Sequence, residues 1–286
     1  MLITISSVGG APGVTSWALL LAAAWPSGVG DHDRVVLEAD CDGGVLGARY
    51  ELGVEPGAVA LISACRRREG QLVIEQLGRP LAEGLWVVPG PEVAEQARPV
   101  WTSGATDVAD RLAADRRWWI VDGGRLRPGS PLAALAAAAT VNLVVSGPSL
   151  AALIQLPARL ASLGGWGGTD DRSGGAGDGP TVGVIVVGRP DHHHDELREY
   201  LDPAPIWVVP SHDDLPALAL GAVRGGRARR SLVWRAALDL AADIALLAAP
   251  VAPVSPLGSA AGADGPAHPI SPAMEAAMAS VREHRR

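Results

Sequence analysis

A glycine-rich stretch near the start of the chain has the residue types of a phosphate-binding loop. It runs from Ser7 to Ser16 with the sequence SVGGAPGVTS, between the apolar segment Leu2–Ser6 and the helix-forming segment Trp17–Ala24. A turn of this kind directs backbone N–H groups and the positive end of a helix toward one point, where an anion can bind. The residues expected to form this site are Gly9, Gly10, Ala11, Gly13, Val14, Thr15 and Ser16.

The charge of this stretch differs from that of a standard phosphate-binding loop, G-x-x-x-x-G-K-[ST]. Gly13 and Thr15 match the last glycine and the hydroxyl residue. Val8 and Val14 stand at the positions of the first glycine and the lysine. All 24 basic residues of the chain are arginine, so no lysine can come from elsewhere in this chain or from a second copy of it.

Two apolar segments farther along the chain end in carboxylates. Val35–Asp40 is typical of a buried parallel strand and carries Glu38 and Asp40 at its end. Trp118–Asp122 is a second such segment, and two glycines follow Asp122. Parallel strands present their carboxyl ends at one edge of a sheet, so both ends are expected beside the glycine-rich turn. A carboxylate there can hold Mg²⁺ through water, which makes Asp122 a candidate metal-binding residue.

The stretch Val8–Ser16 resembles the deviant Walker A loop of the MinD/ParA family, G-K-G-G-x-G-K-T-T, and aligns with it without a gap. The family's two lysines fall on Gly9 and Val14. Its second strand ends in a V-D-x-D pattern whose two aspartates fall on Glu38 and Asp40. The resemblance implies a P-loop ATPase fold with ATP and Mg²⁺ as cofactors, paired copies and protein partners. Such a pair would position chromosome, plasmid, septum, or secretion and pilus machinery.

The same resemblance implies a role for each candidate side chain. Thr15 would bind Mg²⁺ directly, and Asp122 would hold it through water. Glu38 and Asp40 would lie around the metal, with Asp40 also orienting the attacking water as the catalytic residue. Without the loop lysine, a charge-assisted contact of about 1.5–3 kcal/mol is lost. We therefore expect weak ATP binding and little or no hydrolysis, unless an arginine near a motif end compensates.

The alternation of apolar and helix-forming segments predicts an α/β fold with a mostly parallel, seven-stranded sheet covered by helices on both faces. This domain is expected over residues 1–248, with a Pro/Ala/Gly-rich disordered tail and a short terminal helix over residues 249–286. The predicted strands are Leu2–Ser6, Val35–Asp40, Leu85–Gly90, Trp118–Asp122, Val141–Ser146, Thr181–Val187 and Ile206–Pro210. The predicted helices include Thr106–Ala114, Ser149–Leu163, Asp195–Tyr200, Asp213–Val223 and Ser231–Ala248.

Composition narrows the set of partners. A net charge of −7 argues against strong nucleic-acid binding, but a local arginine cluster permits weak, non-specific DNA binding. Cys41 and Cys65 have neither metal-site nor disulfide spacing, which is typical of a reducing, cytoplasmic location. No apolar run has the length of a membrane span, and membrane binding is not expected. The arginine cluster comprises Arg224, Arg227, Arg229, Arg230 and Arg235.

Three functional alternatives remain open from the sequence. The first is an ATP-dependent switch with impaired hydrolysis, in which Arg49 or Arg125 can replace the lost charge. The second is a pseudo-ATPase that keeps the fold as an adaptor without nucleotide turnover. The third is a dinucleotide-binding oxidoreductase with Glu38 on a ribose, but its G-x-G-x-x-G pattern needs a glycine where Val8 stands. His192–His194 is expected to be a polar turn rather than a metal site.

Overall fold

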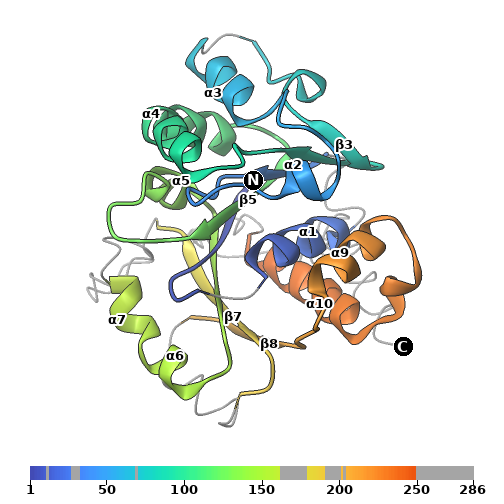
Figure 1. Cartoon of the computed structure of the whole chain (residues 1–286). Helices are drawn as coiled ribbons and strands as arrows, with labels where there is room; N and C mark the ends of the chain where they lie inside the picture. Colours follow the sequence, from blue (N-terminus) through green and yellow to red (C-terminus); the bar gives the residue numbers. More distant parts are fainter. Residues whose placement is uncertain are drawn as a thin grey trace, which may run out of the picture.

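The computed structural model describes residues 1–10, 13–26, 33–67, 70–161, 179–190, 201 and 204–248. Within them, a single eight-stranded sheet runs through the molecule with helices on both sides (Figure 1). The strand order is β3-β4-β2-β5-β1-β6-β7-β8. The strands are β1 Leu2–Ser7, β2 Arg34–Glu38, β3 Arg79–Ala82, β4 Leu85–Val88, β5 Trp118–Arg125, β6 Val141–Ser146, β7 Thr181–Val187 and β8 Ile206–Val209. The mostly parallel α/β fold predicted from the sequence is confirmed.

The predicted count of seven strands was one too low. The additional strand, β3, runs antiparallel to β4 at the edge of the sheet, whereas every other pairing among the described strands is parallel. Its sequence is RPLA, and Arg79 and Pro80 are exposed. A short, half-exposed strand that contains proline is tolerated at a sheet edge and lacks the apolar run that marked the others.

Alternate residues of the central strands pack into two separate cores. Leu2 of β1 points into the core beneath α3 to α7, whereas its neighbour Ile3 points into the core beneath α1, α9 and α10. Figure 1 shows these two groups of helices on opposite faces of the sheet. The helices are α1 Val14–Ala24, α2 Leu46–Arg49, α3 Ala58–Arg67, α4 Ala94–Ala113, α5 Ala133–Ala138, α6 Leu150–Ile154, α7 Leu156–Ala161, α9 Leu215–Val223 and α10 Leu232–Leu247.

Two helices differ from the sequence-based expectation. α4 begins at Ala94 rather than Thr106, and continues through Pro99. It is held by burial of Trp101 and by close packing at Gly104, where an added Cβ would lie 2.5 Å from Ile62 Cγ2. The predicted helix Ser149–Leu163 is divided into α6 and α7, and the break precedes Pro157 as expected for a residue that lacks an N–H donor.

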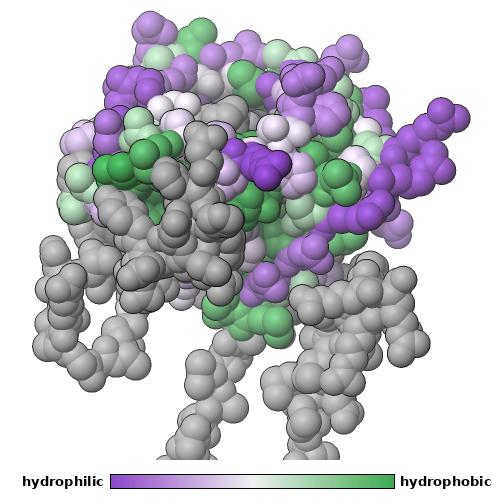
Figure 2. Space-filling model, turned by 90° about the horizontal axis from the view of Figure 1, so that it is seen from below, coloured by the Kyte–Doolittle hydropathy of each residue, from purple (hydrophilic) through white to green (hydrophobic). Residues whose placement is uncertain are grey.

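Several large apolar side chains of the described residues are exposed at the surface. Leu232 of α10 is 66% exposed. Figure 2 shows hydrophobic groups interspersed with hydrophilic ones on the face of the molecule turned toward the viewer. In the described part of the chain, no helix is long and apolar enough to cross a membrane. Cys41 and Cys65 are buried free thiols, and burial raises the pKa of each to about 11, which keeps them protonated. The predicted tail, the helix Asp195–Tyr200 and the His192–His194 run lie outside the described residues.

Candidate functional site

The glycine-rich turn connects β1 to α1, at the carboxyl edge of the sheet. Gly10 has φ +74° and Gly13 has φ +88°, conformations that side chains with a Cβ rarely adopt. Gly13 precedes the first residue of α1, and a Cβ there would lie 2.5 Å from Leu215 Cδ2. Steric space as well as conformation therefore requires glycine at position 13. Gly9 and Gly10 are exposed, and Ala11 lies outside the described residues.

α1 begins at Val14, so its amino end lies at the turn. The described residues of its first turn include no acidic side chain, and Gly13 at the cap has no side chain to accept a hydrogen bond. The positive end of the helix dipole is therefore not offset by these residues. Val14 is 6% exposed and packs into the core beneath α1. The position expected for a lysine therefore holds a core side chain, and its apolar character has a structural use.

Asp122 has the most unusual environment of the predicted site residues. Its side chain is fully buried in β5, and its Oδ1 accepts a hydrogen bond of 3.1 Å from the Gly124 N–H. Among the described residues no donor is bonded to its Oδ2, although the nearby Thr15 hydroxyl favours the charged form. Burial, with a smaller contribution from the negative charge of Glu38, raises the pKa of Asp122 to about 7. A buried, unsatisfied carboxylate oxygen is costly unless a ligand or cation satisfies it.

Glu38 lies opposite Asp122, but its oxygens are occupied. Its Oε1 accepts hydrogen bonds from the backbone N–H groups of Val45 at 2.5 Å and Leu46 at 2.8 Å. Its Oε2 accepts one from Gly90 at 3.0 Å. Burial raises the pKa of Glu38, and these N–H donors partly offset the rise. The geometry gives Glu38 a structural role at the end of β2, and its predicted part in metal binding remains untested.

Asp40 packs against the backbone that follows Asp122. A Cβ at Gly124 would lie 2.0 Å from Asp40 Cγ, and the φ of Gly124 is +53°. The Asp40 Oδ1 accepts a 2.8 Å hydrogen bond from the Asp42 N–H. Burial raises the pKa of Asp40, while the hydrogen bond from the Asp42 N–H and the positive charges of Arg127 and Arg98 lower it. The fold thus gathers Glu38, Asp40 and Asp122 at the edge where Thr15 lies, as the sequence predicts.

The side chains of two arginines lie against the turn. β5 does not end at Asp122 as predicted but continues to Arg125, which pairs with Ser7 of β1. A Cβ on Gly10 would lie 2.9 Å from Arg125 Nη2, and a Cβ on Gly9 would lie 2.5 Å from Arg159 Nη1. Arg125 was one of two arginines that the sequence singled out. The other, Arg49, ends α2 beside Tyr50.

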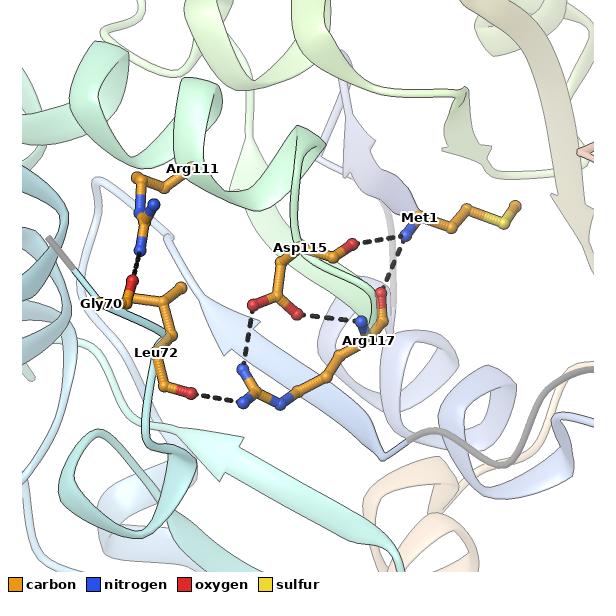
Figure 3. A network of polar contacts seen from close by, with 6 residues as sticks. All are labelled: Met1, Gly70, Leu72, Arg111, Asp115 and Arg117. Carbon is orange, nitrogen blue, oxygen red and sulfur yellow. Dashed lines mark hydrogen bonds and ion pairs between the residues drawn. The ribbon is translucent and has the colours of Figure 1, made fainter. Parts of the chain in front are cut away.

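A separate cleft of about 620 Å³ lies at the opposite, amino edge of the sheet. Two of its arginines are engaged, as Figure 3 shows: Arg111 Nη2 donates to the Gly70 carbonyl at 2.6 Å, and Arg117 pairs with Asp115 at 3.1 Å. Arg117 also donates to the Leu72 carbonyl. These bonds hold the chain around the sheet edge, and the cleft is remote from the turn and from Asp122.

Four members of the predicted arginine cluster lie on the segment between α9 and α10, and the fifth, Arg235, lies in the first turn of α10. Arg229 has a structural role. Its Nε donates to the Ala222 carbonyl at 2.8 Å, and its guanidinium lies 5.2 Å from the Trp234 ring centroid. The other four members, Arg224, Arg227, Arg230 and Arg235, are exposed. The structure therefore brings exposed positive charge to this surface, while DNA binding itself remains a prediction.

No protein-family model and no curated protein matches the chain. Among solved structures, a ParA family ATPase from Chlorobium tepidum TLS is similar over 84% of this chain and 96% of its own, with a TM-score of 0.62 and 16% identity. MinD of Pyrococcus horikoshii OT3, solved with Mg-ADP, is similar over 87% of this chain and 97% of its own, with a TM-score of 0.60 and 17% identity. MinD of Pyrococcus furiosus is similar over 86% of this chain and 98% of its own, with a TM-score of 0.59 and 20% identity. The chain therefore has the fold of the ParA and MinD ATPases.

Proposed function

We propose that this chain is a MinD/ParA-like protein that binds ATP with Mg²⁺ at the Gly9–Ser16 turn and hydrolyses it little or not at all. The observation that carries the proposal is the buried Asp122 carboxylate, whose Oδ2 lacks a donor among the described residues and whose neighbour is the Thr15 hydroxyl. A helix that begins beside it favours a negatively charged ligand.

Magnesium fits the groups around Asp122. Hard cations prefer oxygen ligands, and Mg²⁺ commonly binds one or two protein oxygens together with phosphate oxygens of the substrate. Thr15 would hold the ion directly and Asp122 through water, while Asp40 is placed to orient a water molecule. When bound, the ion neutralises charge on the phosphate oxygens. It would also offset the cost of ionising Asp122, which burial imposes.

Weak ATP hydrolysis is expected because the turn has no lysine at position 14. Val14 fills the core where a lysine would reach the phosphates, and the chain has no other lysine. Such a charge contributes most in the transition state, where negative charge develops on the transferred group. The second candidate, an adaptor that keeps the fold without nucleotide turnover, is favoured by this same burial of Val14.

The fold supports a role that depends on protein partners. Its structural relatives carry the names of ParA and septum site-determining proteins, and we infer that this chain likewise acts in positioning or partitioning of cellular machinery, with paired copies as the working unit.

The test is equilibrium binding of ATP, ADP and GTP by calorimetry, with and without Mg²⁺. We expect Mg²⁺ to tighten ATP binding to the wild type, and Asp122→Asn to remove this dependence. Asp110→Asn is the matched control, because it makes the same chemical change at an exposed position of α4. Absence of ATP binding by the folded wild type would overturn nucleotide binding and favour the adaptor. Robust Mg²⁺-dependent turnover that Asp40→Ala abolishes would instead contradict impaired hydrolysis.

A further inference from the structure

Two guanidinium groups lie against successive glycines of the turn. Arg125 reaches Gly10 from the end of β5, and Arg159 reaches Gly9 from α7. A Cβ added to Gly10 would lie 2.9 Å from a guanidinium nitrogen of Arg125, and a Cβ added to Gly9 would lie 2.5 Å from one of Arg159. The two arginines are separated by 34 residues in sequence, so they are brought together only by the fold.

The position of Arg125 follows from the sheet. β5 and β1 are neighbours, Ser7 pairs with Arg125, and the Leu126 N–H donates to the Ser7 carbonyl at 2.7 Å. The chain therefore leaves β5 directly beside the point where β1 becomes the turn. Arg125 is exposed, and no carboxylate pairs with it among the described residues. Its charge is available to a ligand on the turn.

Arg159 is held in place by its own helix and by the turn. Its Nη2 donates to Gln155 Oε1 at 2.5 Å, and its Nη1 lies 3.5 Å from the Val8 carbonyl oxygen. These contacts direct one edge of the guanidinium along α7 and the other toward the backbone before Gly9. The side chain is half-buried, so its position is restricted while part of it remains open to solvent.

We propose that Arg125 and Arg159 supply, within one chain, the positive charge that this phosphate-binding turn lacks at Gly9 and Val14. The ligand class is a nucleoside triphosphate, recognised through its polyphosphate. A guanidinium suits this task because its planar set of donors can bind two phosphate oxygens at once and stays charged. The inference rests on the proposed function, and adds to it the two residues that replace the lysines in binding.

Two other arginines at the same edge of the sheet, Arg98 and Arg127, form ion pairs with Asp42. Arg127 stands two residues beyond Arg125, but it pairs with Asp42 at 3.1 Å, as Arg98 does from α4 at 2.5 Å. Arg127→Gln therefore removes the same charge two residues farther along the chain, from a side chain that pairs with Asp42. This makes it the matched control for Arg125→Gln and Arg159→Gln.

The experiment measures the dissociation constants of Mg-ATP and of inorganic tripolyphosphate for the wild type and these three variants, after circular dichroism has shown that each is folded. Both guanidinium groups keep contact with solvent, so we take the lower end of the range for charge-assisted bonds and expect about a tenfold loss of affinity for each of Arg125→Gln and Arg159→Gln. Arg127→Gln should stay within about twofold, because it breaks the ion pair with Asp42 and affects a ligand on the turn only through long-range electrostatics. Arg125→Lys should recover part of the loss, since it restores the charge but not the planar fork.

The outcomes separate the two proposals. If the wild type binds Mg-ATP but Arg125→Gln and Arg159→Gln match Arg127→Gln, the arginine assignment fails and nucleotide binding stands. If either substitution tightens binding, the guanidinium blocks the phosphate position and the assignment also fails. If the folded wild type binds neither Mg-ATP nor tripolyphosphate, both proposals fail together.

Discussion

Glu38 and Asp122 lie directly opposite each other on β2 and β5, and both carboxyl groups are buried. Their surroundings differ: Glu38 accepts three backbone hydrogen bonds, whereas Asp122 accepts one backbone hydrogen bond, from Gly124. Two like charges this close to each other favour protonation of the one that is less well solvated. The ionisation of Asp122 is therefore the costly step at this edge of the sheet.

The first prediction is that Asp122 makes the protein less stable as the pH rises. Its pKa is about 7 in the folded chain, against an ordinary value of 3.8. Between these values the folded state binds more protons than the unfolded state, so the free energy of unfolding falls as the pH increases. Asp122→Asn lacks this titration, and its melting temperature relative to wild type should rise by a few degrees between pH 4 and pH 7.

Thermal unfolding followed by circular dichroism across this range provides the measurement. Burial also raises the pKa values of Glu38 and Asp40, but both variants contain them, so their effects largely cancel in the difference. Asp110→Asn should show a difference that does not change with pH. A constant difference for Asp122→Asn as well would mean that Asp122 does not titrate in this window.

The second prediction concerns the hydroxyl of Thr15. Thr15→Val replaces it with a methyl group of similar size, and Thr15→Ser keeps it. We expect Thr15→Val to remove the Mg²⁺ dependence of ATP binding and Thr15→Ser to preserve it, because the hydroxyl is the proposed oxygen ligand. Calorimetry at equal nucleotide concentration, with and without Mg²⁺, measures the dissociation constant of ATP for each variant. Equal Mg²⁺ dependence in both variants would exclude Thr15 as a ligand.

The third prediction is that lysine returned to the turn strengthens ATP binding. Val14→Lys should tighten it by about tenfold, the value of one charge-assisted contact. Gly9→Lys together with Val14→Lys should add less, since a side chain at Gly9 must displace the Arg159 guanidinium. The gain from Val14→Lys should be larger in an Arg125→Gln background if both groups serve the same phosphates. Unchanged dissociation constants in folded proteins would show that the turn does not hold phosphate.

The fourth prediction is that any DNA binding is weak, non-specific and confined to the arginine cluster at the start of α10 and in the segment before it. Arg224, Arg227 and Arg230 are exposed, and their joint replacement by alanine should abolish it. Arg229 is left in place because it supports Trp234. Phosphate contacts release counterions, so the affinity of wild type should fall steeply with salt. A fluorescence titration with duplex DNA measures this, and binding unchanged by the triple substitution would exclude the cluster.

Much of the fold could be predicted because its strands are apolar runs bounded by turn residues. The bounds of β6 and β7 agree with the predicted segments Val141–Ser146 and Thr181–Val187. β5 extends three residues past Asp122 because Gly123 and Gly124 can continue beside β1 through a register shift between Ile5 and Ser7. That continuation depends on the neighbouring strand and is not visible in the local sequence.

The site was predictable to the extent that spacing determines it. The position of Asp122 at the carboxyl edge of the sheet follows from its place in the chain, but the three N–H donors to Glu38 come from Val45, Leu46 and Gly90 and depend on tertiary packing. Arg125 could be suspected because it lies three residues after Asp122. Arg159 has no such signal, since only the packing of α7 brings it to Gly9.

The position of β1 between β5 and β6 has a consequence for how the site can open. Its residues contribute to both cores and its backbone is bonded on both sides, so its amide protons should exchange with solvent only when the whole domain unfolds. The turn is thus attached to one of the slowest-exchanging parts of the molecule. α7 has six residues, of which Leu156 is buried, and should exchange far sooner. Access of a ligand to the turn would then be governed by excursions of the segment that carries Arg159, while the β1 side stays fixed.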